Sequence, residues 1–270
     1  MPELPEVETT RQGIRPCCEG KAVRQLRVFE PRLRWPVPDD LPQRLEGATI
    51  HALKRRGKYL LLIVDEGAVL VHLGMSGSVR VVTESEPRRT HDHLELEMED
   101  GALLRYHDPR RFGCWLWSDQ WEQHPLIRHL GPEPLSPEFT GEYLYRLSRG
   151  RQVPVKSFLM DSKTVVGVGN IYANESLFKA GILPGRAAGR IGLDRYKRLV
   201  THVRDTLSTA ITQGGTTLRD FVNSSGQPGY FAQSLQVYGR EGQPCRLCNR
   251  PLSQSRLGQR TTVFCRHCQR

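Results

Sequence analysis

The first residues of the chain, Met1-Pro2-Glu3, contain groups that could form a covalent bond with a substrate. If Met1 is removed, which a small second residue permits, the chain begins with the secondary amine of Pro2. An α-amino group has a pKa near ~7.8, against ~10.4 for lysine, so it is far more often the free nucleophile at neutral pH. Attack on a sugar carbon gives a cationic iminium, and Glu3, Glu6 or Glu8 could move protons. However, proline followed by acids also begins many ordinary helices, which is the favoured interpretation of these residues alone.

Four cysteines near the other end of the chain have the spacing of a metal site. Cys245 and Cys248 form one CxxC pair and Cys265 and Cys268 another, with sixteen residues between the pairs. Four thiolates at this spacing can bind one tetrahedral Zn²⁺, and a complete shell makes that zinc structural. Redox-active cysteines and disulfides are the alternatives, and both are uncommon in a reducing compartment. The remaining cysteines are predicted to be packing residues: Cys17, Cys18 and Cys114.

The charge of the chain indicates a polyanionic partner, with nucleic acid ahead of a membrane surface. Its 270 residues include 39 Lys and Arg against 29 Asp and Glu, a net charge of +10. Residues 240–270 contain seven arginines and one acid, a net charge of +6. Among these arginines, Arg260 follows Gly258-Gln259, where a hairpin tip is expected. A metal-bound hairpin that carries arginine suits the backbone of a nucleic acid.

Hydropathy favours a cytoplasmic protein with no membrane segment. No run of residues approaches the ~18 apolar residues of a membrane helix. The N-terminus also lacks the basic-then-apolar pattern of a signal peptide.

The N-terminal half predicts a short helix followed by an antiparallel β-sandwich or barrel. Residues 6–14 are helical in pattern, with acids in the first turn. In residues 91–98, Leu94, Leu96 and Met98 alternate with acids, so one face is expected to be buried and the other exposed. The proline-rich run 31–42 predicts a loop. The predicted strands are residues 22–29, 49–53, 59–64, 69–73, 79–83, 91–98 and 103–107.

Three loops in this half carry side chains that are unusual in a plain sandwich. Lys58 follows Arg55-Arg56-Gly57, which fits a solvated turn or a lysine aimed at a phosphate with its pKa lowered by the arginines. Met75 lies between two glycines at a predicted hairpin tip, where it could contact a partner or fill the core. Phe112 directly follows two arginines in a turn, which suits a wedge that enters a base stack beside a phosphate clamp.

The chain is predicted to have two domains and a terminal zinc finger. A proline-rich linker over residues 132–137 separates a domain at 1–131 from a helical domain at 138–235, and the finger covers 236–270. Apolar residues recur at helical spacing between Asp194 and Gly214-Gly215, and this stripe is assigned to core packing. It consists of Tyr196, Leu199, Val200, Val203, Leu207, Ala210 and Ile211.

A glycine-containing turn at residues 165–170 lies between helices predicted near 156–162 and 171–180. Asn170 is expected to be the N-cap of the second helix. Backbone N–H groups at such a turn can bind an anion, so a DNA phosphate is favoured over simple capping. A nucleotide-binding loop is disfavoured because no strand leads into the turn and no GK[ST] follows it. A polar loop over residues 216–230 could close over a substrate or simply connect rigid parts.

These motifs together resemble those of the bacterial formamidopyrimidine-DNA glycosylase family over essentially the whole chain. The resemblance rests on PELPEVE, HLGMSGS, DPRRFG, VGVGNIYANE and the closing QRTTVFCRHC. It implies an α+β fold with an N-terminal antiparallel β-sandwich, a C-terminal helical domain that contains a helix-two-turn-helix, and a four-cysteine zinc finger hairpin. One structural Zn²⁺ would be the cofactor.

The resemblance also implies a function. The family's activity is that of a bifunctional DNA glycosylase and AP lyase, which excises oxidised purines from duplex DNA as a monomer in base excision repair. Pro2 would be the nucleophile, Glu3 its acid–base partner, Lys58 an aid to β-elimination, and Arg260 a phosphate ligand linked to δ-elimination.

Six further residues match DNA-contacting positions of the family. Three would fill the void left by an everted nucleotide, namely Met75, Arg110 and Phe112. Three would contact the DNA elsewhere, namely His91, Arg151 and Asn170. The neighbouring Arg111 leaves the assignment of Arg110 open, and Arg151 stands where lysine is common in the family.

Two other functions remain open from sequence. The endonuclease VIII branch shares the architecture and prefers oxidised pyrimidines, but PELPEVE and the loop around residues 223–230 fit the purine branch better. A non-catalytic zinc-finger protein would bind DNA tightly and salt-sensitively without cutting it. The joint presence of Pro2, Glu3 and Lys58 favours the enzyme.

Overall fold

In the computed structural model of the chain, residues 2–216 and 231–270 are described, and their contacts divide them into two units. The N-terminal unit comprises residues 2–128 with 213–216 and 231–232, and the C-terminal unit comprises His129–Thr212 and Gln233–Arg270. Most of the predicted loop at 216–230 therefore lies outside the described residues. No helix of the described ranges is long and apolar enough to cross a membrane.

The N-terminal unit begins with helix α1 (Leu4–Cys18). Helix α1 extends beyond the predicted residues 6–14 in both directions, and Pro16 is tolerated in the last turn of the helix. The further elements in chain order are β1 (Lys21–Val28), α2 (Leu41–Leu45), β2 (Thr49–Ile50), β3 (Ala52–Arg56), β4 (Tyr59–Val64), β5 (Gly67–His72), β6 (Ser78–Val82), β7 (Asp92–Met98), β8 (Leu103–His107), β9 (Cys114–Ser118) and the 3₁₀ turn η1 (Trp121–Gln123). Strand β9 was not predicted, and α2 begins inside the predicted loop at 31–42.

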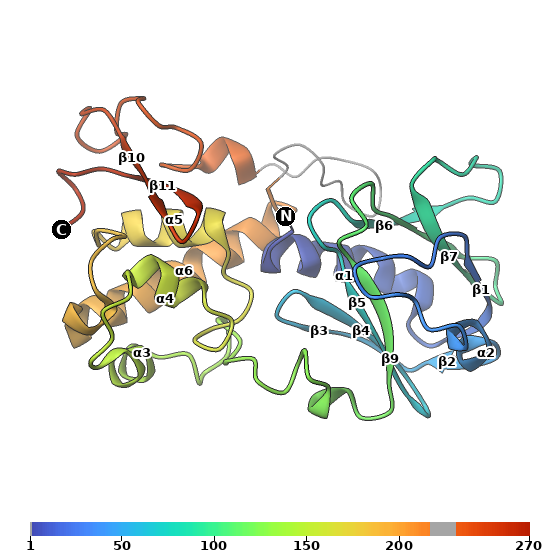
Figure 1. Cartoon of the computed structure of the whole chain (residues 1–270). Coiled ribbons are helices and arrows are strands. Elements are labelled where there is room, and N and C mark those ends of the chain that lie inside the picture. The colour runs from blue at the N-terminus through green and yellow to red at the C-terminus, as the bar shows by residue number, and fades with distance from the viewer. Residues whose placement is uncertain (1, 217–230) are drawn as a thin grey trace. The chain divides into compact units, whose positions relative to one another are not determined.

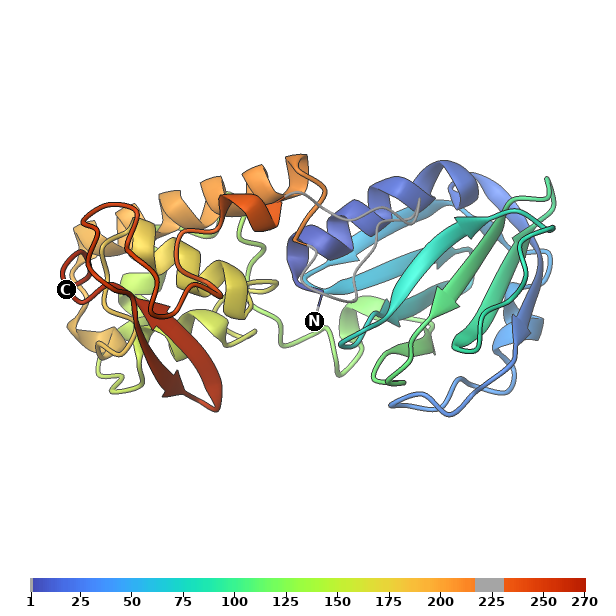
Figure 2. The ribbon, with the colours of Figure 1, turned by 90° about the horizontal axis from the view of Figure 1, so that it is seen from above.

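The strands of this unit form two antiparallel sheets, which confirms the predicted sandwich. One has the order β2-β1-β7-β8-β6 and the other the order β3-β4-β5-β9 (Figure 1). Apolar side chains of both sheets share one core, because alternate residues of each strand point inward. Helix α1 packs against strands of both sheets, mostly the edge strands β3 and β6 (Figure 2). A helix over these edges blocks their pairing with another chain.

Two loops cross from one sheet to the other at neighbouring positions. Residues 73–77 connect β5 to β6, and residues 108–113 connect β8 to β9. Strand β5 pairs with β9 and β6 pairs with β8, so the two sheet-crossing loops must lie side by side. The prediction that Met75 lies at a hairpin tip is therefore wrong, since β5 and β6 belong to different sheets.

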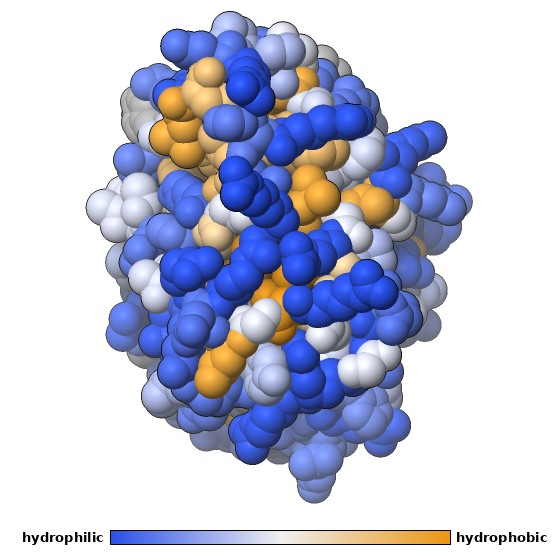
Figure 3. All heavy atoms as spheres, turned by 90° about the vertical axis from the view of Figure 1, so that its left-hand side faces the viewer, coloured by the Kyte–Doolittle hydropathy of each residue, from blue (hydrophilic) through white to orange (hydrophobic). Residues whose placement is uncertain are grey.

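The C-terminal unit is helical up to a terminal hairpin. Its elements are α3 (Gly141–Ser148), α4 (Val155–Met160), α5 (Asn170–Lys179), η2 (Ala188–Arg190), α6 (Leu193–Thr212), η3 (Phe231–Ser234, which spans the unit boundary), β10 (Ser253–Leu257) and β11 (Arg260–Phe264). The apolar stripe of α6 is buried as predicted, except that Ile211 is only half-buried. Helix α3 was not predicted. Hydrophilic side chains cover most of the face of this unit that is shown in Figure 3, with small apolar patches between them.

Candidate active site and metal centre

The side chain of Glu3 is fixed at the start of α1, directly after Pro2. Glu3 is the N-cap of the helix, and its carboxylate accepts a hydrogen bond from the backbone of Glu6 while Oε2 of Glu6 accepts from the Glu3 N–H at 2.8 Å. Glu3 is 2 % exposed, and Oε1 of Glu6 also accepts from the N–H of Thr216. Glu6 therefore orients the first residues of the chain, a role that the sequence did not reveal.

Glu8, which the sequence offered as one of three groups that could move protons, has a structural role. Its carboxylate bonds to Arg11 at 2.7 Å and to Nε of Arg55 on β3 at 2.9 Å. Burial alone raises the pKa of Glu8, but the hydrogen bonds from Arg11 and Arg55 outweigh burial and lower this pKa below its usual range. Glu8 is thus held as a carboxylate that ties α1 to β3.

Lys58 lies in the two-residue turn of the β3–β4 hairpin. Arg56 pairs with Tyr59, and Gly57 has a φ of 58°, which fits a turn with glycine at its first central position. Nη1 of Arg55 donates to the carbonyl of Gly57 at 3.0 Å. Arg55 is itself bound to Glu8 of α1, so helix α1 positions this turn and with it Lys58. The same helix positions Pro2 and Glu3 at its N-terminus.

The sheet-crossing loops bring Met75, Arg110 and Phe112 to one end of the sandwich. A Cβ on Gly74 would come 2.4 Å from the carbonyl carbon of Phe112, so Gly74 is required for this close approach. The ring of Phe112 is 43 % exposed, although a large apolar side chain is normally buried. The guanidinium of Arg110 lies 4.8 Å from the centre of that ring.

Arg111 differs from Arg110 in backbone and in partners. It has a φ of 55°, in the left-handed region, and its guanidinium lies 3.5 Å from Glu30. Arg111 thus has an acidic partner, whereas the guanidinium of Arg110 lies over the Phe112 ring, so the geometry supports Arg110 as the arginine that acts with this ring.

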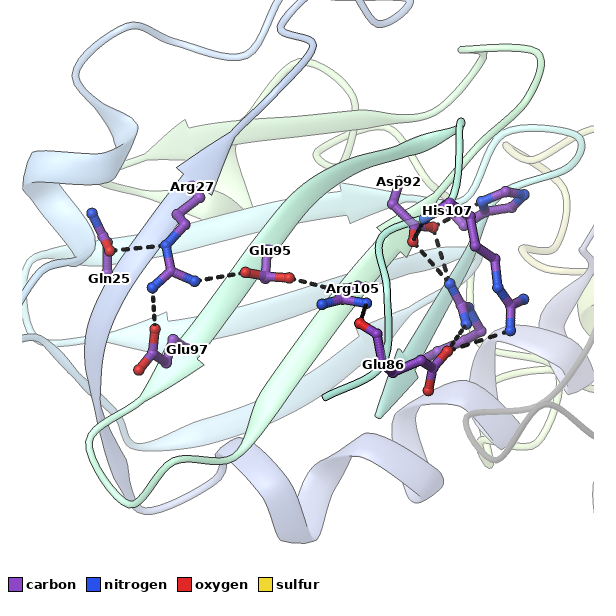
Figure 4. A network of polar contacts seen from close by, with 10 residues as sticks. Gln25, Arg27, Glu86, Asp92, Glu95, Glu97, Arg105 and His107 are labelled. Atoms are coloured by element: carbon purple, nitrogen blue, oxygen red, sulfur yellow. Dashed lines mark hydrogen bonds and ion pairs between the residues drawn. The ribbon is translucent and has the colours of Figure 1, made fainter. Parts of the chain in front are cut away.

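His91 is exposed immediately before β7, where a chain of ion pairs covers the outer face of the sheet (Figure 4). Asp92 bonds to Arg80 at 3.0 Å and lies 2.9 Å from Nδ1 of His107. Burial alone raises the pKa of Asp92, but the hydrogen bond with His107 and the charge of Arg80 lower this pKa to about 2. The network therefore fixes the end of β7 next to His91.

The same network corrects the prediction that the acidic face of β7 is exposed. Glu95 is only 6 % exposed because it bonds to Arg27 at 2.6 Å and to Arg105 at 2.5 Å. Arg105 also donates to the backbone carbonyl of Glu86, which holds the loop before β7 over this face (Figure 4).

In the C-terminal unit, Asn170 is the first residue of α5, and its N-cap is Gly169 and not Asn170 as predicted. Gly169 has an extended φ of −115°, so the turn ends at Gly169 and the helix begins one residue earlier than predicted. Nδ2 of Asn174 donates to the carbonyl of Asn170 at 2.6 Å, which leaves the Asn170 side chain half-buried at the start of the helix. Arg151 is exposed, and its Nε donates to the carbonyl of Leu147.

Arg260 begins β11 at the tip of the terminal hairpin, as predicted. It pairs with Leu257, and Gly258 and Gln259 form the two-residue turn with φ values of 53° and 60°. Two buried polar side chains attach this hairpin to the helices. Lys156 on α4 donates to the carbonyl of Thr261 at 2.9 Å, and Oδ1 of Asn174 accepts from the N–H of Val263 at 3.0 Å.

The four predicted metal ligands are brought together. The sulfur atoms of Cys245, Cys248, Cys265 and Cys268 all lie within 4.8 Å of one another. Zinc–sulfur bonds of about 2.3 Å in a tetrahedron require sulfur separations of this size, so the donor set fits one zinc ion. The distance of 3.5 Å between the sulfurs of Cys248 and Cys265 excludes a disulfide there. Cys18 and Cys114 are buried as predicted, and burial raises the pKa of each thiol to about 12.

Each unit thus assembles one set of the predicted residues. The N-terminal unit contains Pro2, Glu3, Lys58, Met75, His91, Arg110 and Phe112, and the C-terminal unit contains Arg151, Asn170, Arg260 and the four cysteines. The residues that position them were missed: Glu6 and Glu8 were considered only as groups that could move protons, and Lys156 only as part of a helix. Asn174 could have been recognised from its spacing of four after Asn170, which puts both on one helix face.

Comparison with protein families gives two matches. A model described as the formamidopyrimidine-DNA glycosylase N-terminal domain matches residues 1–115. A second, described as the formamidopyrimidine-DNA glycosylase H2TH domain, matches residues 130–222.

Individual relatives cover the full chain. The formamidopyrimidine-DNA glycosylase of Marinobacter nauticus is 63 % identical over 270 residues, and that of Methylococcus capsulatus is 58 % identical over 271, with 100 % of each chain covered. The crystal structure of MutM (Fpg) from Thermus thermophilus has a TM-score of 0.88 at 39 % identity and covers 99 % of this chain and 98 % of that one. A Lactococcus lactis Fpg mutant in complex with DNA containing Fapy-dG has a TM-score of 0.91 at 32 % identity, with 100 % of both chains covered.

Proposed function

The chain belongs to the formamidopyrimidine-DNA glycosylase family, and on that basis we propose that it excises oxidised purines from duplex DNA and then cleaves the strand at the resulting abasic site. It acts as a monomer in the cytoplasm, on chromosomal DNA. One observation carries the proposal: Glu3 is the N-cap of α1, so its capping box holds a buried carboxylate directly beside Pro2. Mere capping does not require the preceding residue to be proline.

The chemistry starts from the free amine of Pro2, which exists only after Met1 is removed. The neutral nitrogen attacks C1′ of the damaged nucleotide as the bond to the base breaks, and the base leaves as an anion that takes up the proton lost by the Pro2 nitrogen. Glu3 then donates a proton to the sugar ring oxygen as the ring opens, and the nitrogen lone pair completes the iminium. The iminium acidifies the hydrogens on C2′. Loss of one of them expels the 3′ phosphate, and a second elimination expels the 5′ phosphate, which leaves a one-nucleotide gap.

Lys58 and Arg260 act on the phosphates that leave. Lys58, in a turn that α1 fixes through Glu8 and Arg55, assists the first elimination. Arg260, at the hairpin tip, binds a phosphate and supports the second elimination. The four cysteines would hold a structural Zn²⁺, which would take no part in these steps and would stabilise the hairpin.

The remaining predicted residues bind and deform the DNA. The exposed ring of Phe112, with Arg110 and Met75 beside it, enters the base stack and fills the void of the everted nucleotide. His91, Arg151 and Asn170 contact the DNA away from the lesion.

The lesion class is inferred from relatives. Their solved complexes include DNA with Fapy-dG, DNA with carbocyclic 8-oxo-G and DNA with an oxidised pyrimidine. A panel of end-labelled duplexes that differ only in the lesion separates a purine preference from the pyrimidine preference of the endonuclease VIII branch.

The decisive experiment blocks the N-terminal amine. Protein that starts at Pro2, confirmed by intact mass, is compared with the same protein acetylated at Pro2 or extended by one residue. The free form should cut an 8-oxoguanine duplex at both phosphates and give a covalent adduct with borohydride. Both blocked forms should do neither while still binding the duplex. Full strand cleavage by a blocked form would place the chemistry on another group, and binding without cleavage by the free form would indicate a non-catalytic DNA-binding protein.

A further inference from the structure

Asp108, the first residue of the sheet-crossing loop that carries Phe112, is completely buried, with 0 % of its surface exposed. Its carboxylate accepts three hydrogen bonds: from the hydroxyl of Ser76 at 2.8 Å, from the hydroxyl of Tyr106 at 3.0 Å and from the N–H of Gly113 at 2.9 Å. Ser76 belongs to one sheet-crossing loop and Gly113 to the other. One carboxylate therefore bridges the loop of Met75 and the loop of Phe112.

The backbone of Asp108 extends this set of contacts. Its N–H donates to the carbonyl of His91 at 3.0 Å, and its own carbonyl accepts from the N–H of Arg111 at 3.1 Å. The hydroxyl of Ser76, which donates to Asp108, accepts in turn from the N–H of Arg110 at 3.3 Å. The residues expected to touch the DNA at this end of the sandwich are thus each bonded to Asp108 or lie next to a residue that is.

The partners of the Asp108 carboxylate are neutral, in contrast to those of Asp92 at the start of the neighbouring strand β7. Among the residues that the structure describes, no lysine or arginine forms an ion pair with Asp108, whereas Asp92 is paired with Arg80. Burying a carboxylate without a cation costs free energy, and three neutral donors offset that cost only when all of them are correctly placed. The site is therefore sensitive to geometry.

The ring of Tyr106 fits closely against this arrangement. A Cβ on Gly113 would lie 1.8 Å from the Tyr106 hydroxyl, so the loop backbone rests directly on that group. Tyr106 itself is 1 % exposed and belongs to the apolar core. The core, the carboxylate and both loops consequently form one continuous packed structure.

We propose that Asp108 is a positioning residue for base eversion, which holds Met75, Arg110 and Phe112 as one rigid group; this rests on the proposed function, because it assigns those three residues to the void in the DNA. Rigid support matters since a wedge that yields on contact cannot supply the few kcal/mol needed to unstack a base pair. Loosening one loop should therefore slow eversion and leave the chemistry on an already exposed sugar unchanged.

The experiment compares two substrates with the same sequence under single-turnover conditions. One duplex carries a fully paired 8-oxoguanine, which must be everted, and the other a preformed abasic site, which has no base to evert. Asp108→Asn keeps the size of the side chain but replaces one of the two carboxylate oxygens, which together accept from Ser76, Tyr106 and Gly113, with an NH2 donor. We expect its excision of the paired lesion to fall by at least about tenfold, because even a 1 Å misplacement can cost about 100-fold, while cleavage of the abasic duplex stays within about threefold.

Three variants complete the design. The quantity compared is the ratio of the excision rate on the paired lesion to the cleavage rate on the abasic duplex. Ser76→Ala and Tyr106→Phe each remove one donor and should lower this ratio by less than Asp108→Asn does, so the test does not depend on a single variant that fails to fold. Phe112→Ala removes the wedge itself and sets the full size of the effect. Asp92→Asn is the matched control, because it alters a buried aspartate of β7, next to β8, that bonds to neither sheet-crossing loop.

The outcomes separate this inference from the proposed function. Wild-type protein that cleaves neither duplex contradicts the proposed function. Wild-type protein that cleaves both, together with Asp108→Asn protein in which both rates fall equally or neither falls, contradicts the positioning role alone. A ratio that changes as much in Asp92→Asn as in Asp108→Asn also contradicts it.

Discussion

The two units hold their functional side chains in different ways. In the N-terminal unit, Lys58, Met75 and Phe112 lie on short turns of a sandwich whose two sheets share an extensive apolar core. In the C-terminal unit, Arg260 lies on a two-stranded hairpin whose own buried core is small and includes two of the cysteines. A lone two-stranded hairpin is at best marginally stable. The first group therefore depends on packing, and the second on a few polar contacts and on the metal that the four cysteines are proposed to bind.

The largest expected effect comes from removing the metal, because structural zinc contributes on the order of 10–16 kcal/mol to folding in zinc-finger peptides. Cys248→Ser should abolish strand cleavage through the loss of Arg260 placement, with metal content measured by mass spectrometry. All four tryptophans (Trp35, Trp115, Trp117 and Trp121) belong to the N-terminal unit, so their fluorescence should report an unchanged urea midpoint there. Cys17→Ser, outside the cluster, is the control. Full strand cleavage by protein without bound metal would show that the placement of Arg260 does not depend on metal, which would contradict the contrast drawn between the two units.

A cavity in the sandwich core should have the next largest effect. It should destabilise the N-terminal unit and leave the metal content unchanged, the reverse of what is expected for Cys248→Ser. Leu62 is 2 % exposed, and Leu62→Ala should lower the free energy of unfolding by about 2–5 kcal/mol. Tryptophan fluorescence in urea measures this change, and the metal content should stay the same. Leu247→Ala changes a side chain that is 70 % exposed and should alter stability by less than about 0.5 kcal/mol. Loss of metal in the Leu62 variant would mean that the units do not fold independently.

Acid should weaken the Met75 loop through His72. Burial, together with the charges of Lys58 and Arg34, lowers the pKa of His72 to about 4, and its neutral Nδ1 accepts from the N–H of Gly74 at 3.0 Å. The folded state binds fewer protons than the unfolded state, in which histidine has a pKa near ~6.5. The contribution of neutral His72 to the stability of the folded state is therefore fully present above about pH 6.5. The free energy of unfolding falls by on the order of 2–3 kcal/mol as the pH decreases to about 4.

The measurement for this prediction is urea unfolding between pH 4 and pH 7, again by tryptophan fluorescence. His72→Asn removes the titrating ring, so the pH dependence of the variant should be flatter than that of the wild type over this window. Parallel curves for the two proteins would assign the acid sensitivity to other groups.

The smallest effect is expected for the polar contact between α5 and the hairpin. Asn174→Ala leaves the N–H of Val263 without its acceptor and should cost about 1–2 kcal/mol of stability. Because Arg260 is on the same strand, the products of an abasic duplex should shift from double elimination toward single β-elimination. Gln254→Ala, on the exposed side of the hairpin, is the control. An unchanged product ratio in Asn174→Ala would show that metal binding alone positions Arg260.

Local pattern predicted most of the strands, and two of them, residues 59–64 and 103–107, have the predicted bounds. It could not predict which strands pair, and for that reason Met75 was placed on a hairpin when its loop joins two sheets. The prediction of an exposed face for β7 was wrong for a similar reason, since the arginines that cover Glu95 come from other strands of the sheet.

At the candidate site, sequence indicated the residues of unusual type but not the residues that support them. Cysteine spacing identified the four metal ligands because such spacing is rarely accidental. Asp108 gave no such signal, since an aspartate before a proline at a strand end is also an ordinary turn. The choice between Arg110 and Arg111 needed the backbone conformation and Glu30.

Because the sheet-crossing loops join two sheets at neighbouring strands, their lengths are set by the spacing between the layers. Surface loops usually accept insertions and deletions during evolution. Here an added or lost residue would push the sheets apart or misalign the strand pairs on both sides. Over evolutionary time, length variation in this sandwich should therefore accumulate in segments such as residues 29–40, while residues 73–77 and 108–113 keep a constant length and diversify only by substitution.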